Sequence, residues 1–181
     1  MTAKEAFQRI SKGGGDDFAY LVSICEQTGD YCLVGGLAVN CYVDPVYTFD
    51  ADFVVHSDHL GEIRKLLEKA GFTIEDHPHS MNAQMPGSEL RIQFTKDTRY
   101  QNFVSRAETK EVLGQSIRVA CLADLIQGKI WAWSDPQRRL SKRQKDQADL
   151  IRIAEAFPKM RSRLPKEIQK LFASSSSSSS R

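Results

Sequence analysis

Short apolar strands alternate with helical segments along about the first 120 residues, and glycine, proline and aspartate mark the turns between them. Strands are predicted at residues 31–34, 49–56, 71–75 and 89–97, with a hairpin around Gly114-Gln115. Residues 76–88 are predicted to form a polar loop. This alternation favours an α/β or α+β fold, with a mixed β-sheet flanked by helices and a C-terminal helical portion.

The chain is predicted to form one domain, or one domain plus a helical appendage, with four successive parts. Its 181 residues can bury a sizeable core without a disulfide. Residues 1–29 are expected to be N-terminal helices, the first within residues 5–10, and residues 30–121 the core. Helices in residues 122–172 are expected to complete the domain, and the Ser-rich residues 173–181 to be disordered.

Composition excludes several classes of protein. No apolar run approaches the ~18 residues of a membrane span, which excludes a transmembrane protein. The N-terminus lacks the apolar segment and small-residue cleavage site of a signal peptide. The four cysteines show no CxxC spacing and fit a protein kept reduced. We therefore expect a cytoplasmic protein with no membrane partner.

Charge is distributed unevenly along the chain. Residues 1–90 contain 6 Lys and Arg against 14 Asp and Glu, a net charge of −8. Residues 91–181 contain 19 Lys and Arg against 9 Asp and Glu, a net charge of +10. The basic half suggests a polyanionic partner such as RNA, and the structural alternative is a set of solvated helix faces.

Two short segments carry candidate chemistry. Gly35-Gly36 follows an apolar strand and opens a helix, where glycine lets the backbone approach a ligand and exposed N–H groups favour phosphate; alone, such a pair is more often a tight turn. Asp50 and Asp52 stand two residues apart at a strand start, so both carboxylates project to one face. Their repulsion is offset either by a divalent cation or, in the structural alternative, by capping at Asp50 and a Lys or Arg partner for Asp52.

Taken together, the segments resemble a known motif. Gly35-Gly36, thirteen further residues, then Asp50-Ala51-Asp52-Phe53 is similar to the nucleotidyltransferase superfamily that includes DNA polymerase beta, and Thr48 matches a common Thr-x-Asp-x-Asp form. Residues 121–133 and 141–153 resemble the last helices of minimal nucleotidyltransferases, which include the abortive-infection type IV toxin–antitoxin nucleotidyltransferases. The resemblance covers roughly residues 30–155 and implies a nucleotidyltransferase-like fold.

The resemblance implies transfer of a nucleoside monophosphate from a nucleoside triphosphate (NTP) to an acceptor hydroxyl. Asp50 and Asp52 would ligate Mg²⁺ or Mn²⁺, which neutralises the triphosphate and orients in-line attack. Gly35 and Gly36 would contact phosphate through backbone N–H groups, and Thr48 would belong to the nucleotide site.

Two residues of the C-terminal helices also match the family pattern. Lys129 corresponds to a helical lysine that would hold phosphate or offset developing charge. Asp146 corresponds to an acidic residue that would orient this lysine or the nucleotide. The structural alternative for Lys129 is a surface lysine paired with Asp124 or Asp135.

The chain departs from the family pattern at two positions. The superfamily usually supplies a third carboxylate from a later strand, and the matching position holds Gln93, a poor general base. Asp97 and Glu89 are the candidate substitutes. Relatives often carry Arg where this chain has Val46. If no third carboxylate reaches the site, binding of nucleotide without efficient transfer is expected.

Other candidate residues carry less chemistry. His77 and His79 could bind a transition metal, but two ligands in one loop are a thin set, and an exposed loop is favoured. Trp131 and Trp133 point to different sides of one helix, where one is expected in the core and the other could stack on a base. A basic run after that helix could track phosphates or be a solvated helix end: Arg138, Arg139, Lys142, Arg143 and Lys145.

The sequence therefore predicts a metal-dependent nucleotidyltransferase whose acceptor is RNA, protein or a small molecule. A catalytically weak nucleotide- or RNA-binding protein of the same fold is the alternative. It could be a component of a toxin–antitoxin pair with a cognate protein partner. A structural domain without a nucleotide site is a third interpretation.

Overall fold

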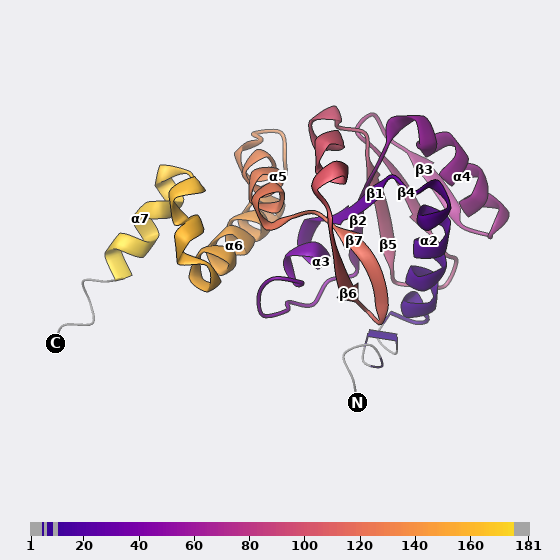
Figure 1. Cartoon of the computed structure of the whole chain (residues 1–181), viewed down its shortest axis with the longest axis horizontal. Helices are drawn as coiled ribbons and strands as arrows, with labels where there is room; N and C mark the ends of the chain where they lie inside the picture. Colours follow the sequence, from indigo (N-terminus) through magenta and orange to yellow (C-terminus); the bar gives the residue numbers. More distant parts are fainter. Residues whose placement is uncertain (1–4, 6, 9–10, 176–181) are drawn as a thin grey trace. The chain divides into compact units, whose positions relative to one another are not determined.

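The computed structural model describes residues 5, 7–8 and 11–175, which fall into two compact units (Figure 1). The sheet unit extends to Cys41 and resumes over Pro45–Cys121. The helical unit consists of Tyr42–Asp44 and the chain from Leu122 onward. The helix expected within residues 5–10 lies partly outside the described residues, and Glu5, Phe7 and Gln8 are helical.

The sheet unit is built on a seven-stranded mixed sheet with the strand order β3-β4-β5-β2-β1-β7-β6. Strand β2 pairs antiparallel with β1 and parallel with β5, and β1 pairs parallel with β7. The predicted fold class is thereby confirmed. The strands are β1 (Tyr31–Val34), β2 (Asp50–Val55), β3 (Thr73–Asp76), β4 (Ser80–Gln84), β5 (Arg91–Thr95), β6 (Glu108–Val112) and β7 (Gln115–Val119).

Besides the helical residues Glu5, Phe7 and Gln8, the described part of the same unit contains five helices. Two are long enough to carry an apolar face, α2 (Gly14–Thr28) and α4 (Leu60–Lys69). They lie beside each other in Figure 1 and contact each other. The short helices are α3 (Gly35–Val39), η1 (Ser57–His59) and η2 (Thr98–Arg106).

Alternation along the central strands gives this part of the sheet two different faces. Ala51 and Phe53 of β2 are fully buried, and the Phe53 ring lies 6.2 Å from that of Phe18 on α2. Because neighbouring residues of a strand point to opposite faces, Asp50 and Asp52 project from the face opposite α2. This burial of every second residue positions the carboxylates.

The predicted polar loop at residues 76–88 is wrong in its centre, where β4 forms. Met81 and Ala83 of β4 are buried, and the strand is hydrogen-bonded on both sides, to β3 and β5. The intervening Asn82 and Gln84 lie on the other face. Pairing with two neighbours therefore overrides the low strand propensity of Asn and Gln.

The predicted hairpin around Gly114 is confirmed by the pairing of β6 with β7. Leu113 and Gly114 both have positive φ, 51° and 79°, as a two-residue hairpin turn requires. Arg118 on β7 donates hydrogen bonds to the carbonyls of Gly29 and Val104, which connects β7 to the C-terminal end of α2 and to η2.

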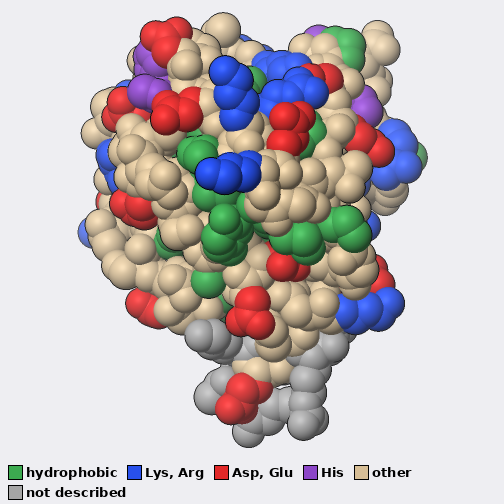
Figure 2. All heavy atoms as spheres, turned by 90° about the vertical axis from the view of Figure 1, so that its right-hand side faces the viewer, with side chains coloured by type: hydrophobic (Ala, Val, Ile, Leu, Met, Phe, Trp, Pro, Cys, Tyr) green, Lys and Arg blue, Asp and Glu red, His purple; other side chains and the backbone are tan. Residues whose placement is uncertain are grey.

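The surface on the α2 and α4 side of Figure 1 is shown in Figure 2. Positive and negative side chains alternate across it, and hydrophobic side chains form only a small band. Tyr20 on α2 is half-exposed and stacks on Phe72, with ring centroids 6.5 Å apart. This mixed surface contrasts with the concentrated charge at the start of β2.

The helical unit contains α5 (Leu122–Ser134), α6 (Leu140–Ala156), η3 (Pro158–Arg163) and α7 (Lys166–Ser175). Residues 173–175, at the start of the predicted disordered tail, are helical, and residues 176–181 lie outside the described residues. Among the helices described, none is both long enough and apolar enough to span a bilayer.

Candidate functional site

The start of β2 presents two carboxylates on one face of the sheet. Asp50 and Asp52 are partly exposed, whereas Ala51 between them and Phe53 after them are fully buried. The Asp50 side chain retains 24% of its exposure. Two carboxylates anchored on one central strand form a site with oxygen ligands on a rigid support.

Gly35 packs directly against one of these carboxylates. Val34 of β1 lies opposite Asp52, and Gly35 follows with a φ of +71°. A Cβ at this position would lie 2.0 Å from Asp52 Oδ2. Both the left-handed backbone and the lack of space therefore require glycine. Gly35 and Gly36 are the first two residues of α3, so this helix begins beside the Asp52 carboxylate.

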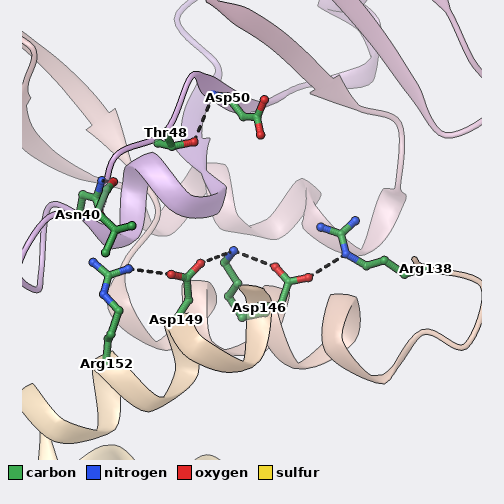
Figure 3. A network of polar contacts seen from close by, with 9 residues as sticks. Asn40, Thr48, Asp50, Arg138, Asp146, Asp149 and Arg152 are labelled. Carbon is green, nitrogen blue, oxygen red and sulfur yellow. Dashed lines mark hydrogen bonds and ion pairs between the residues drawn. The ribbon is translucent and has the colours of Figure 1, made fainter. Parts of the chain in front are cut away.

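Thr48 orients the first carboxylate from the loop before β2. Its side chain is buried, and Oγ1 accepts a hydrogen bond from the Asp50 N–H at 3.2 Å (Figure 3). The hydroxyl thus satisfies the backbone where the strand begins. Thr48 therefore supports Asp50 through the backbone.

Arg91 is the partner that sequence reasoning missed. In the parallel pairing of β2 with β5, Arg91 lies opposite Asp50, and its Nε donates to Asp50 Oδ1 at 2.7 Å. The structural alternative expected a basic partner for Asp52 and capping at Asp50, and the structure places a basic partner at Asp50. The Arg91 side chain is 62% exposed, so this ion pair lies at the surface.

Uncharged amides continue the site along the sheet. Gln93 lies opposite Asp52 on β5, and Asn82 lies opposite Gln93 on β4. Gln93 is exposed and Asn82 partly exposed. The row from Asp52 to Asn82 therefore offers hydrogen-bond donors and acceptors, and Gln93 brings no third negative charge.

Among the described residues, neither candidate substitute for the third carboxylate joins Asp50 and Asp52 in a cluster of three metal-ligating side chains. Glu89 forms an ion pair with Lys12, with Nζ and Oε1 2.7 Å apart. Asp97 forms one with Arg99 and caps η2, four residues beyond Gln93 and about 13 Å along the strand direction. The hydrogen bond and charge of each partner hold the pKa of both carboxyls below their usual range.

The residues at the start of β2 fit a hard divalent cation in part. Mg²⁺ prefers oxygen ligands and is commonly held by one or two carboxylates together with substrate phosphates and water. Asp50 and Asp52 supply two such ligands. Within the described part of the chain, no cluster of three or more His, Cys, Asp or Glu residues is suited to holding a metal. The site therefore fits an ion that arrives with part of its coordination shell supplied by phosphate.

Asp146 and Asp149 belong to a series of ion pairs in the helical unit (Figure 3), and Lys129 lies between them. Lys129 Nζ on α5 lies 2.9 Å from Asp146 Oδ1 and 2.7 Å from Asp149 Oδ2, both on α6. Arg138 contacts the outer oxygen of Asp146, and Arg152 that of Asp149, each at 2.7 Å. The partners of Lys129 on α6 thus include Asp146, as the resemblance implied, whereas the structural alternative had named Asp124 or Asp135.

Burial distinguishes the ion pairs around Lys129 from the pair of Asp50 with Arg91. The side chains of Lys129, Asp146 and Asp149 are almost fully buried. Burial lowers the pKa of Lys129, but the charges of Asp149 and Asp146 and hydrogen bonds to both outweigh it and raise the pKa. Lys129 is therefore a charged lysine enclosed by two carboxylates, and these contacts join α5 to α6.

Part of the basic run also contributes to internal contacts. Arg138 pairs with Asp146, and Arg143 Nε donates to the Trp133 carbonyl at 2.7 Å. Trp133 Nε1 donates to Gln147 Oε1 at 3.3 Å. These side chains join the α5–α6 connection to both helices, so they stabilise the helical unit.

His77 and His79 occupy the exposed turn between β3 and β4. His77 N–H donates to the Ser80 carbonyl at 2.8 Å, and its Nε2 lies 3.7 Å from Glu75 Oε2. This geometry is that of a surface turn.

A scan against protein-family models finds no match, and a search of curated proteins finds none either. Solved structures do match. The lincosamide antibiotic adenylyltransferase LnuA, with lincomycin bound, has a TM-score of 0.53 at 15% identity, covering 76% of this chain and 96% of that chain. ANT(2")-Ia in complex with adenylyl-2"-tobramycin has a TM-score of 0.55 at 13% identity, with 88% and 95% covered.

An antigenic nucleotidyltransferase-like protein from Paracoccidioides brasiliensis matches in the same range. Its TM-score is 0.52 at 18% identity, with 76% of this chain and 74% of that chain covered. The chain therefore has a fold that these nucleotidyltransferases share.

Proposed function

We propose that the protein is a metal-dependent nucleotidyltransferase that moves a nucleoside monophosphate from an NTP to an acceptor hydroxyl. The observation that carries the proposal is the carboxylate pair of Asp50 and Asp52 on one face of β2, with the left-handed Gly35 against Asp52. The nucleotidyltransferase fold of the sheet supports it.

Each predicted site residue of the sheet unit has a role in this proposal. Asp50 and Asp52 hold Mg²⁺ or Mn²⁺, which would neutralise the triphosphate and favour in-line displacement. Gly35 and Gly36 present backbone N–H groups to phosphate, since no side chain at Gly35 stands in the way. Thr48 holds the Asp50 backbone in place through the hydrogen bond at 3.2 Å.

In the helical unit we assign a supporting role to Lys129 and Asp146. Contact of Lys129 with phosphate would require it to leave Asp146 and Asp149, at the cost of two buried negative charges. The ion-pair chain instead fixes α5 against α6. Asp146 orients Lys129, as the family pattern implies.

Gln93 favours a second candidate, a nucleotide- or RNA-binding protein with weak or no transfer activity. A glutamine amide can orient an acceptor hydroxyl by hydrogen bonding but cannot take its proton. The excess of basic residues after position 90 would suit RNA, and a cognate protein in a toxin–antitoxin pair belongs to this alternative.

The acceptor class is part of the proposal. LnuA and ANT(2")-Ia are antibiotic-modifying proteins, as their bound lincomycin and adenylyl-2"-tobramycin indicate. A small molecule bearing hydroxyl groups is therefore the first acceptor to test, followed by RNA ends and protein hydroxyls.

Calorimetric titration with each NTP in the presence of Mg²⁺ tests the nucleotide site. We expect Mg²⁺-dependent binding of at least one NTP, and loss of that binding in Asp50→Asn and Asp52→Asn. Asp97→Asn is the matched control, because Asp97 is an aspartate with a similar exposed arginine partner at the far end of β5. Binding that survives in both site variants would overturn the proposal.

Release of pyrophosphate and labelling of the acceptor from an α-labelled NTP separate the two candidates. Transfer to a hydroxyl compound supports the enzyme. Tight Mg²⁺-dependent binding without transfer to any acceptor class supports the binding protein.

A further inference from the structure

The charge at the candidate site is balanced by an arginine of the chain itself. Asp50 and Asp52 bring two negative charges, and Arg91 Nε lies 2.7 Å from Asp50 Oδ1. Gln93, at the register position opposite Asp52, is neutral. Together these four side chains carry one net negative charge, which attracts a divalent cation weakly.

The ion pair of Arg91 with Asp50 can break at little cost in free energy. Its arginine is 62% exposed, and exposed ion pairs contribute little free energy, about 0–1 kcal/mol. A guanidinium also carries several donors in a planar fork that suits phosphate oxygens. Arg91 can therefore exchange Asp50 for a phosphate at small cost.

We propose that Arg91 makes cation binding at Asp50 and Asp52 depend on the nucleotide, so that the divalent ion enters with the triphosphate. In the free protein the Arg91 guanidinium is bonded to the Asp50 carboxylate, and its positive charge repels a cation that would bind the same carboxylate. When a triphosphate is present, the same guanidinium contacts its negative oxygens and favours the loaded state. This inference rests on the proposed function and identifies Arg91 as its positioning residue.

The sign of the Arg91 effect therefore reverses between two conditions. For a cation alone, Arg91 is repulsive, and its removal strengthens binding. For a cation with a triphosphate, Arg91 is attractive, and its removal weakens binding. A purely structural role for the ion pair would not produce opposite changes, because loss of stability weakens both.

The test measures free Mn²⁺ by electron paramagnetic resonance, with and without α,β-methylene-ATP. The protein is the full chain, as wild type, Arg91→Met and Arg99→Met. Arg99 is the matched control because its pair with Asp97 has nearly the same exposure as the pair of Arg91 with Asp50, 56% and 26% against 62% and 24%. Arg91→Lys keeps the charge and removes the fork.

We expect Arg91→Met to bind Mn²⁺ alone about ten-fold more tightly than wild type, the size expected for one like charge a few ångströms away near water. With the nucleotide analogue we expect it to bind about ten-fold more weakly. Arg91→Lys should resemble wild type for Mn²⁺ alone and be intermediate with the analogue. Arg99→Met should match wild type in both conditions.

Gln93→Glu gives an independent measurement, because it adds a carboxylate opposite Asp52 without touching Arg91. Its affinity for Mn²⁺ alone should also rise. Equal affinities of Arg91→Met and wild type in either condition, or changes of the same sign in both, would overturn the inference while leaving the proposed function intact. Failure of wild type to bind Mn²⁺ even with ATP and GTP analogues would overturn both together.

Discussion

Replacing Lys129 by methionine should destabilise the helical unit far more than removing the charge of an exposed lysine in the same unit. Lys129 is the cation between two carboxylates, with Nζ 2.9 Å from Asp146 Oδ1 and 2.7 Å from Asp149 Oδ2. Its side chain is 9% exposed, and those of the two aspartates are 3% and 5% exposed. Methionine keeps the apolar stem and removes only the charge and its donors.

The expected loss is about 3–5 kcal/mol, the usual range for breaking a buried ion pair by removing one partner. The reason is that two buried carboxylates lose their shared cation, and Asp146 also loses the hydrogen bond that Lys129 donates to it. Arg138 and Arg152 contact the outer oxygens of the two aspartates, so each carboxylate keeps one arginine partner and the loss should lie toward the lower end of this range.

The two tryptophans of the chain, Trp131 and Trp133, both lie on α5 with Lys129, so tryptophan fluorescence reports on this unit. Urea unfolding followed by this signal should show a midpoint lower by about 2 M. Lys145→Met, at an exposed position on α6, should change stability by less than about 0.5 kcal/mol.

A second variant tests whether the stability lost in Lys129→Met comes from the two unbalanced carboxylates or from poorer packing. Lys129→Met combined with Asp146→Leu and Asp149→Leu removes the whole buried set and should recover most of the stability, because well-packed apolar residues can replace a buried ion cluster. A loss below about 1 kcal/mol for Lys129→Met alone would refute the reasoning. It would leave Lys129 available for a phosphate.

Three further outcomes follow from the geometry. Gly35→Ala should weaken Mg²⁺–NTP binding at least ten-fold in calorimetry, because its Cβ would displace the Asp52 carboxylate, whereas Gly29→Ala, with similar φ but open space, should lose only about 1 kcal/mol of stability. Because the pKa of Lys129 is raised, its stabilising contribution is complete below its ordinary pKa of about 10.4 and lost as pH rises through the higher folded value, so the fluorescence-detected urea midpoint should fall only in that alkaline range. Burial raises the pKa of Cys41 to about 11, so its alkylation by iodoacetamide should be slow at neutral pH and accelerate about ten-fold per pH unit, as measured by mass spectrometry.

The strand that carries the carboxylates could be predicted from local pattern alone. The predicted strand at 49–56 corresponds to β2 at Asp50–Val55, and the two-residue period places Asp50 and Asp52 on one face. Gly35 was predictable as a turn glycine. Its contact with Asp52 depends on the pairing of β1 with β2, which no local pattern contains.

Strand β4 could not be found in the same way. Only Met81 and Ala83 are buried apolar residues, and the remaining positions are polar: Ser80, which is buried, Asn82, which is partly exposed, and Gln84, which is exposed. Such a segment has the composition of a loop, and its strand conformation comes from the two neighbours that pair with it.

The partner of Asp50 was missed for a related reason. Arg91 is 41 residues away and reaches Asp50 only because β5 lies parallel beside β2 in one particular register. A one-residue shift would place Ile92 there and turn Arg91 to the other face. The signal available in the sequence was that Arg91 and Gln93 share a face, which limits the charge that a third strand could supply.

Exposure separates two of the places where a carboxylate of this chain contacts a basic side chain. At Asp50 the arginine remains largely in water, so exchanging it for another positive group costs little and a ligand can do so. At Asp146 and Asp149 the lysine is enclosed, so removing it strands two buried charges and no ligand contact of ordinary strength compensates. An aspartate paired with an exposed arginine and two aspartates that enclose a lysine therefore differ in how easily a ligand can replace the basic side chain, although the motif resemblance includes both places in one site.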